Sequence, residues 1–293
     1  MAEDSALRAE QWTVALEQGG LPPFVTERLK AAAAGTVPWM ATMTAAELLI
    51  AKSHGIRPLA TVSGTCWFHY GWSWTEGHAQ GWHEALDRIR REALACGANA
   101  VVDVRMRTLR HKVGASMDFT LVGTAVRLDR LPPSREPVIA TVPALEFVRL
   151  LEMGIVPTGI AVGARYDWLY GSYNSEGATF TNQPLAELGN FWESIRRAAH
   201  ADLRRAVAKQ GNGVLAHTHF GQILKRERDK APPAYLGRHI VVGTVVDTRR
   251  GEGISHPITM MLDMRGRDTV LKAGAGAAHD IYAHDLQDEE GAI

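Results

Sequence analysis

The pattern of hydrophobic and polar positions predicts one order of elements, which occurs twice along the chain. In each occurrence a short amphipathic helix precedes a strand rich in β-branched and aromatic residues, followed by a long amphipathic helix and two strands. The sequence therefore predicts an α+β protein of two α-β-α-β-β units, each with its sheet packed on its long helix. The predicted elements are 44–55, 59–70, 79–96, 100–110 and 116–128, then 143–153, 158–170, 184–210, 214–224 and 238–248.

Short motifs recur in the same order in the two units. The pentapeptide 54–58 resembles 153–157, and Gly123-Thr124-Ala125-Val126 resembles Gly243-Thr244-Val245-Val246. The separation is too long for a solenoid and fits whole domains, so we infer an internal duplication. The predicted domains are 41–130 and 141–250.

Three segments lie outside these domains. Residues 1–40 are predicted to form an accessory helical segment, interrupted by glycines and prolines at 19–23. Residues 131–140 are a proline-rich linker. Residues 251–293 are predicted to form a C-terminal extension with one further strand near 258–264 and an acidic tail at 285–290.

The strands of these thin units have apolar residues on both faces. In the stretch 118–126, positions of either parity are apolar. One face packs on the long helix, so the other face needs cover from a second unit, in the same chain or in another copy.

Composition narrows the function classes. The chain has 293 residues, 46% hydrophobic and 22% charged, with 32 basic and 32 acidic side chains. This balance gives no clear indication of nucleic-acid binding, and basic clusters at 105–112 and 225–230 are interpreted as solvated hairpin tips. Two cysteines, no apolar stretch long enough to span a membrane and no secretory signal predict a cytoplasmic protein.

Several motifs resemble the YbjQ-like family, which is also labelled a heavy-metal-binding domain. They are Val62-Ser63-Gly64-Thr65, the run 94–102 and the run 122–126. The resemblance covers about 44–129 and, more loosely, 141–248. It implies a dodecin-like fold and rings, commonly pentamers, built through the sheets, and it implies no established activity. The chain departs from the family in the loops at 72–74 and 171–173.

Two sets of residues are candidate ligands for a divalent metal ion. His217 and His219 are two apart on a predicted strand, so both imidazoles are expected on one face, at positions matched in the first unit by Asp103 and Arg105. The second set surrounds the loop before the first long helix and consists of Cys66, His69, His78 and His83. The alternative is that these histidines are structural or solvated.

Aromatic residues gather before the long helices. They either stack a flat ligand or bury themselves in a subunit interface. The candidates are Trp67, Trp72, Trp74 and Trp82 in the first unit, and Trp168 and Tyr170 in the second.

No hydrolase, phosphate-loop or dinucleotide motif occurs in the sequence. We therefore expect no enzyme activity. The favoured function is a non-catalytic homo-oligomer assembled through its sheets into a ring, with unknown protein partners. The alternative is a module that binds a metal ion or a small aromatic ligand.

Overall fold

The computed structural model describes most of the chain, which forms two compact parts, 1–249 and 250–293. The described residues are 2–38, 40–69, 73–110, 116–129, 131–170, 186–228, 231–248, 261–262 and 270–271. In the part 250–293, β8 (Met261–Leu262) pairs with β9 (Val270–Leu271). The strand predicted near 258–264 is thus seen at two residues, and the acidic tail lies outside the described residues.

The first sheet, sheet 1, has the strand order β1-β3-β2-β4. The chain reaches it through two helices, α1 (Ala2–Glu17) and α2 (Pro23–Ala34), and then through the short α3. The two-residue β4 pairs in parallel with β2, so part of the predicted linker extends sheet 1. The elements are α3 (Ala45–Ala51), β1 (Ile56–His69), α4 (Trp74–Ala95), β2 (Ala100–Arg110), β3 (Ser116–Leu128) and β4 (Val138–Ile139).

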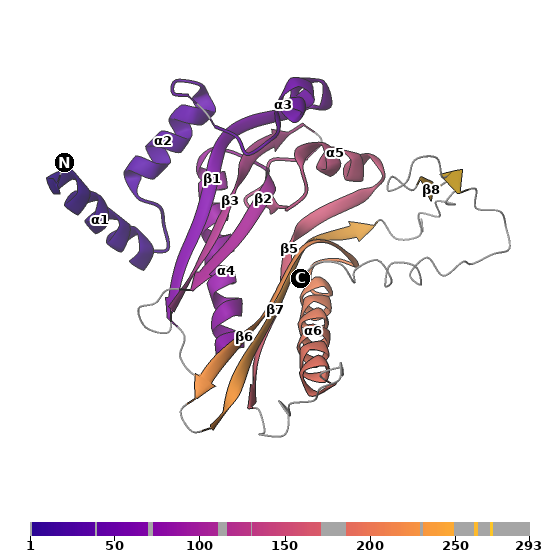
Figure 1. Ribbon diagram of the computed structural model, residues 1–293. Coiled ribbons are helices and arrows are strands. Elements are labelled where there is room, and N and C mark those ends of the chain that lie inside the picture. The colour runs from indigo at the N-terminus through magenta and orange to yellow at the C-terminus, as the bar shows by residue number, and fades with distance from the viewer. Residues whose placement is uncertain are drawn as a thin grey trace. The chain divides into compact units, whose positions relative to one another are not determined.

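The second sheet, sheet 2, has the order β5-β7-β6, which matches β1-β3-β2 (Figure 1). The mixed α+β class predicted from the sequence is confirmed, and the predicted helices and strands at 44–128 and 143–248 occur, most of them with shifted ends. The elements are α5 (Ala144–Glu152), β5 (Ile155–Tyr170), α6 (Ala186–Val207), β6 (Gly213–Arg228) and β7 (Ala231–Thr248).

Two glycines allow the long helices to lie directly on the strands. A Cβ at Gly64 of β1 would collide with the carbonyl oxygen of Ala85 in α4, and one at Gly163 of β5 with that of Ala199 in α6. Backbone approach this close is possible only without a side chain. The two strands also share an irregularity of register, which follows Pro58 in β1 and Pro157 in β5.

Side chains of α4 bind the outer edge of β1. Glu92 is buried and accepts a hydrogen bond from the backbone N–H of Ser63 at 2.7 Å, and Arg88 donates to the carbonyl oxygen of Thr65. Burial raises the pKa of the Glu92 carboxyl, against the lowering effects of the Ser63 hydrogen bond and of Arg28. The free edge of the strand is therefore covered by helix side chains.

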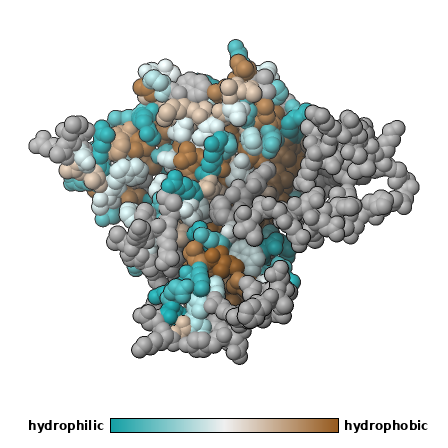
Figure 2. All heavy atoms as spheres, viewed as in Figure 1, coloured by the Kyte–Doolittle hydropathy of each residue, from teal (hydrophilic) through white to brown (hydrophobic). Residues whose placement is uncertain are grey.

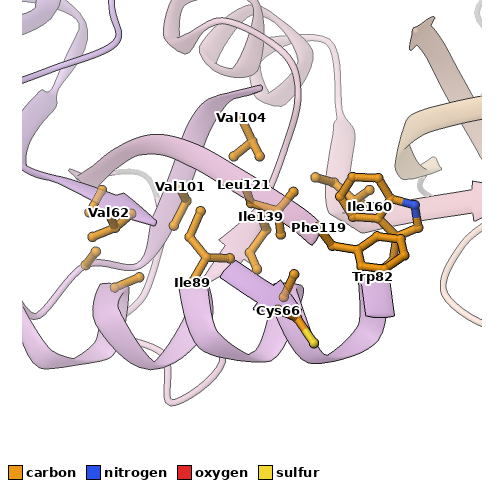
Figure 3. Packing of buried hydrophobic residues seen from close by; sticks show 14 of the residues in the cluster. Val62, Cys66, Trp82, Ile89, Val101, Val104, Phe119, Leu121, Ile139 and Ile160 are labelled. Atoms are coloured by element: carbon orange, nitrogen blue, oxygen red, sulfur yellow. The ribbon is translucent and has the colours of Figure 1, made fainter. Parts of the chain in front are cut away.

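One hydrophobic core contains residues of both sheets. Trp82 and Ile89 of α4 and Phe119 of β3 belong to the same cluster as Ile139 of β4 and Ile160 of β5 (Figure 3). The predicted boundary at 131–140 therefore does not divide the chain into two separate cores. The apolar second face of sheet 2 obtains its cover from the first half of the chain, as the two-faced strands require.

Glu47 joins the two short helices. Its carboxylate accepts hydrogen bonds from the N–H and hydroxyl of Thr44, at 2.9 Å each, and its other oxygen accepts from the N–H of Ala144 at 2.9 Å. Thr44 caps α3 in return, which completes the predicted capping box. One buried carboxylate thus binds the N-terminal ends of α3 and α5.

We expect Glu47→Ala to lower the free energy of unfolding by about 2–3 kcal/mol, because it leaves backbone donors at two helix ends without their acceptor. Urea unfolding followed by circular dichroism measures the change. Glu146→Ala is the matched control, since Glu146 has the same place in α5 but is exposed. Equal effects of the two substitutions would contradict this role of Glu47.

Candidate functional site

His78 lies in an aromatic enclosure. Its ring is 4.9 Å from that of Phe119, 5.2 Å from that of Tyr166 and 5.8 Å from that of Trp82. The side chain is fully buried, and among the described residues neither ring nitrogen has a hydrogen-bond partner. Burial and, to a smaller extent, the charge of Arg238 together lower the pKa of His78 from 6.5 to about 3. The imidazole is therefore neutral, and it packs as a core side chain between α4 and β5.

The other members of this candidate metal set point elsewhere. Cys66 is buried against α4, and burial raises the pKa of its thiol, whereas His69 and His83 are exposed. Within the described ranges, no three His, Cys, Asp or Glu side chains lie where they could hold a metal ion. The structure thus does not bring Cys66, His69, His78 and His83 together. The spacing in the sequence could not reveal this, because it does not show which side of α4 faces the core.

His217 and His219 lie on β6, and their side chains are outside the described residues. Their backbone register corrects the expected match between His219 and Arg105. Arg105 pairs with Val122 and Thr218 pairs with Val242, so His219 has the ladder place of Met106 rather than that of Arg105. Asn99 follows Gly97 by two residues, whereas the corresponding Asn212 directly follows Gly211, and the glycine-based alignment hid this difference. His217 falls at a register shift in β6.

The aromatic candidates separate into buried and exposed groups. Trp82 is buried in the core, whereas Trp67 is 65% exposed on β1. Trp72 and the side chain of Trp74 lie outside the described residues. The first aromatic group is therefore not seen as one pocket.

Trp168 and Tyr170 lie together at the end of sheet 2. Their rings are stacked, with centroids 6.3 Å apart and planes inclined by 20°. The guanidinium carbon of Arg228 is 5.6 Å from the centre of the Tyr170 ring. These residues line a cavity of about 510 Å³ together with Arg226, Glu227 and Ala234. The sequence indicated the aromatic pair and the basic run separately, and only the pairing of β5 and β6 with β7 unites them.

A second cavity, of about 610 Å³, lies between α3 and the start of β1. Leu48, Ala51 and Ile56 give it an apolar wall, and Asp129 adds a carboxylate. Nearby on α3, Leu49 is 84% exposed, and apolar atoms reach the surface where α3 lies, at the top of the space-filling view (Figure 2). Leu49 is an apolar residue of the short amphipathic helix predicted at 44–55, so its exposure differs from the expectation that such residues are covered.

A family model described as "Putative heavy-metal-binding" matches residues 71–129 of the chain. This confirms the YbjQ-like resemblance for that segment, about a fifth of the chain, while the resemblance of 141–248 stays a prediction. No curated protein and no solved structure matches the chain. Of the described helices, none has the length and hydrophobicity to cross a membrane.

The matched segment tests the metal label of the family. Its described histidines and cysteine are His78, His83 and Cys96. His78 is enclosed by aromatic rings, His83 is exposed, and Cys96 is buried with its thiol pKa raised to about 11, mainly by burial. These residues do not fit a common metal ion, because they do not converge and the thiol stays protonated.

Proposed function

We propose that this chain is a non-catalytic assembly protein, made of two YbjQ-like units in tandem, which binds further copies of itself head to tail. The observation that carries the proposal is the exposed Leu49. It is the fifth residue of α3, whereas the fifth residue of α5, Val148, is 1% exposed within a core cluster. The same helix position is thus covered in one half of the chain and open in the other.

Matching hydrogen bonds support the tandem arrangement. The hydroxyl of Thr124 in β3 accepts from the N–H of Thr42 at 2.7 Å, and that of Thr244 in β7 accepts from the N–H of Thr141 at 2.9 Å. Asn99 and Asn212 each accept a bond from the final residue of the middle strand of their sheet. Equal strand order and equal side-chain bonds are what a duplicated unit predicts.

A second pair of positions repeats the contrast between Leu49 and Val148. Tyr166, the twelfth residue of β5, lies against His78 of α4, with ring centres 5.2 Å apart. Trp67 has the twelfth place in β1 and is 65% exposed. The second half of the chain thus places two apolar positions against the first half. The first half presents the corresponding positions at the surface.

Head-to-tail association explains both contrasts. A second copy would cover Leu49 and Trp67 with its second half, using α6 as α4 is used within the chain. Trp192 of α6 corresponds to His78 of α4. Each lies equally far before the alanine whose carbonyl oxygen faces the strand glycine, Ala85 at Gly64 and Ala199 at Gly163. Trp192 is half-buried. Such a heterologous contact gives a closed ring if the rotation between copies closes, as the family resemblance implies.

Leu49→Lys tests the proposal. Burying a leucine contributes about 1.5–3 kcal/mol, and a buried lysine adds a cost, so we expect association at least about 100-fold weaker. Native mass spectrometry of wild-type protein should show a multiple of the chain mass, and the variant should shift to the single-chain mass.

Leu7→Lys is the control, because Leu7 is 54% exposed on α1 and has no place in the proposed contact. It should leave the oligomer unchanged. A wild-type protein that is monomeric at micromolar concentration would overturn the proposal, and so would an oligomer that Leu49→Lys leaves intact.

A further inference from the structure

We propose that the end of sheet 2 is a binding site for a planar aromatic anion of about mononucleotide size, held between Trp168, Tyr170, Arg226 and Arg228. The site is independent of the proposed assembly through Leu49. It rests on the strand register, the ring geometry and the charges around the cavity of about 510 Å³.

The register places an aromatic and a cationic side chain in one row. Tyr170 of β5 pairs with Ala234 of β7, and Ala234 pairs with Arg226 of β6. Residues directly opposite in an antiparallel ladder point to the same face. The middle member of the row is an alanine, and its small side chain lines the cavity together with Tyr170 and Arg226. Trp168 is two residues before Tyr170 and therefore shares this face.

The two rings form a stacking surface for a flat ligand. They are nearly parallel, inclined by 20°, and Tyr170 is 65% exposed. An indole and a phenol supply large rigid contact area at a low cost in side-chain entropy. Arg228 lies 5.6 Å from the centre of the Tyr170 ring, which places a positive charge beside the stack.

The charges at this surface favour an anion. Glu227 forms an ion pair with Lys225 at 3.2 Å. Among the described side chains, no carboxylate pairs with Arg226 or Arg228. Two guanidinium groups near one cavity match the fork geometry of a phosphate or carboxylate. The cavity volume lies in the usual range for small-molecule sites.

These features define the ligand chemistry as a flat ring that stacks beside Tyr170 and Trp168 and a phosphate or carboxylate that reaches the arginines. A nucleoside monophosphate carries both parts, and so does an aryl phosphate. The proposed ligand is a small molecule, and the experiment below distinguishes it from a nucleic-acid strand.

The test is isothermal titration calorimetry of the full chain with adenosine monophosphate and 1-naphthyl phosphate. Adenosine, inorganic phosphate and a single-stranded oligonucleotide serve as comparison probes. We expect at least one of the two aromatic phosphates to bind. Adenosine and inorganic phosphate should bind about 10-fold more weakly or not at all, because adenosine lacks the anionic group and inorganic phosphate lacks the ring.

The double variant Arg226→Gln/Arg228→Gln should weaken this binding by about 10-fold or more, and Trp168→Leu should weaken it as well. Lys209→Gln is the control. It removes one positive charge from an exposed residue just after α6, and Lys209 does not line the cavity. Unchanged melting temperatures would show that the variants fold.

Three results would overturn the proposal. The first is no binding of either aromatic phosphate up to about 10 mM, a concentration at which even a fragment-sized ligand of low affinity would bind. The second is binding that the double variant and Lys209→Gln affect equally. The third is an oligonucleotide that binds far more tightly than either small probe, which would assign the surface to a nucleic-acid strand.

Discussion

Gly64→Ala is expected to lower the free energy of unfolding by more than about 3 kcal/mol and to reduce the yield of folded protein. The added Cβ would overlap with the Ala85 carbonyl oxygen and lie 2.8 Å from the backbone nitrogen of Ile89. Both obstacles are helix backbone, so α4 must move away from β1 and open the core. Urea unfolding or, for an unstable variant, the soluble fraction after expression measures the effect.

Gly189→Ala is the matched control for a glycine-to-alanine change. Gly189 lies in α6 with no described atom within 4 Å of an added Cβ. Alanine has the higher helix propensity, so this variant should be more stable by about 0.5–1 kcal/mol. A Gly64→Ala protein as stable as the wild type would show that α4 does not lie on β1 as described.

His78→Phe is expected to remove much of the acid sensitivity of the fold. The pKa of His78 falls from 6.5 to about 3 on folding, so between these pH values the unfolded chain binds a proton that the folded chain does not. Stability is therefore lost as the pH falls below 6.5, by about 1.4 kcal/mol per pH unit. A phenylalanine fills the aromatic enclosure without this cost.

The measurement is the free energy of unfolding of both proteins at several pH values between 7 and 4. Glu92, whose pKa is raised, contributes with the opposite sign, but it is present in both proteins and cancels in the difference. The stability difference should grow in favour of the variant as the pH falls. A constant difference would mean that the pKa of His78 is the same in the folded and the unfolded chain.

Local signals predicted the elements well because they depend on neighbouring residues. The capping box of Thr44 and Glu47 starts α3, and Gly55 follows it in a left-handed conformation with φ of 67°. The strands predicted at 100–110 and 116–128 have these ends in the structure. Turn glycines and capping residues act over a few positions, so the sequence displays them directly.

The site residues were harder to predict because they depend on contacts between distant segments. His78 was a candidate ligand by its distance from Cys66 and His83, yet Tyr166, far along the chain, makes it a core residue. The basic run at 225–230 was interpreted as a solvated hairpin tip. Its relation to Tyr170 depends on the partners of β7, which no local pattern specifies.

The covered edge of β1 restricts how copies could meet in the proposed assembly. Glu92 and Arg88 bind the backbone groups with which a new strand would pair. A neighbouring chain therefore cannot continue the hydrogen-bonded ladder of sheet 1 at this edge without first displacing helix side chains. In the proposed assembly, contacts at this edge would therefore consist of side chains alone, and subunits could exchange there while sheet 1 stays intact.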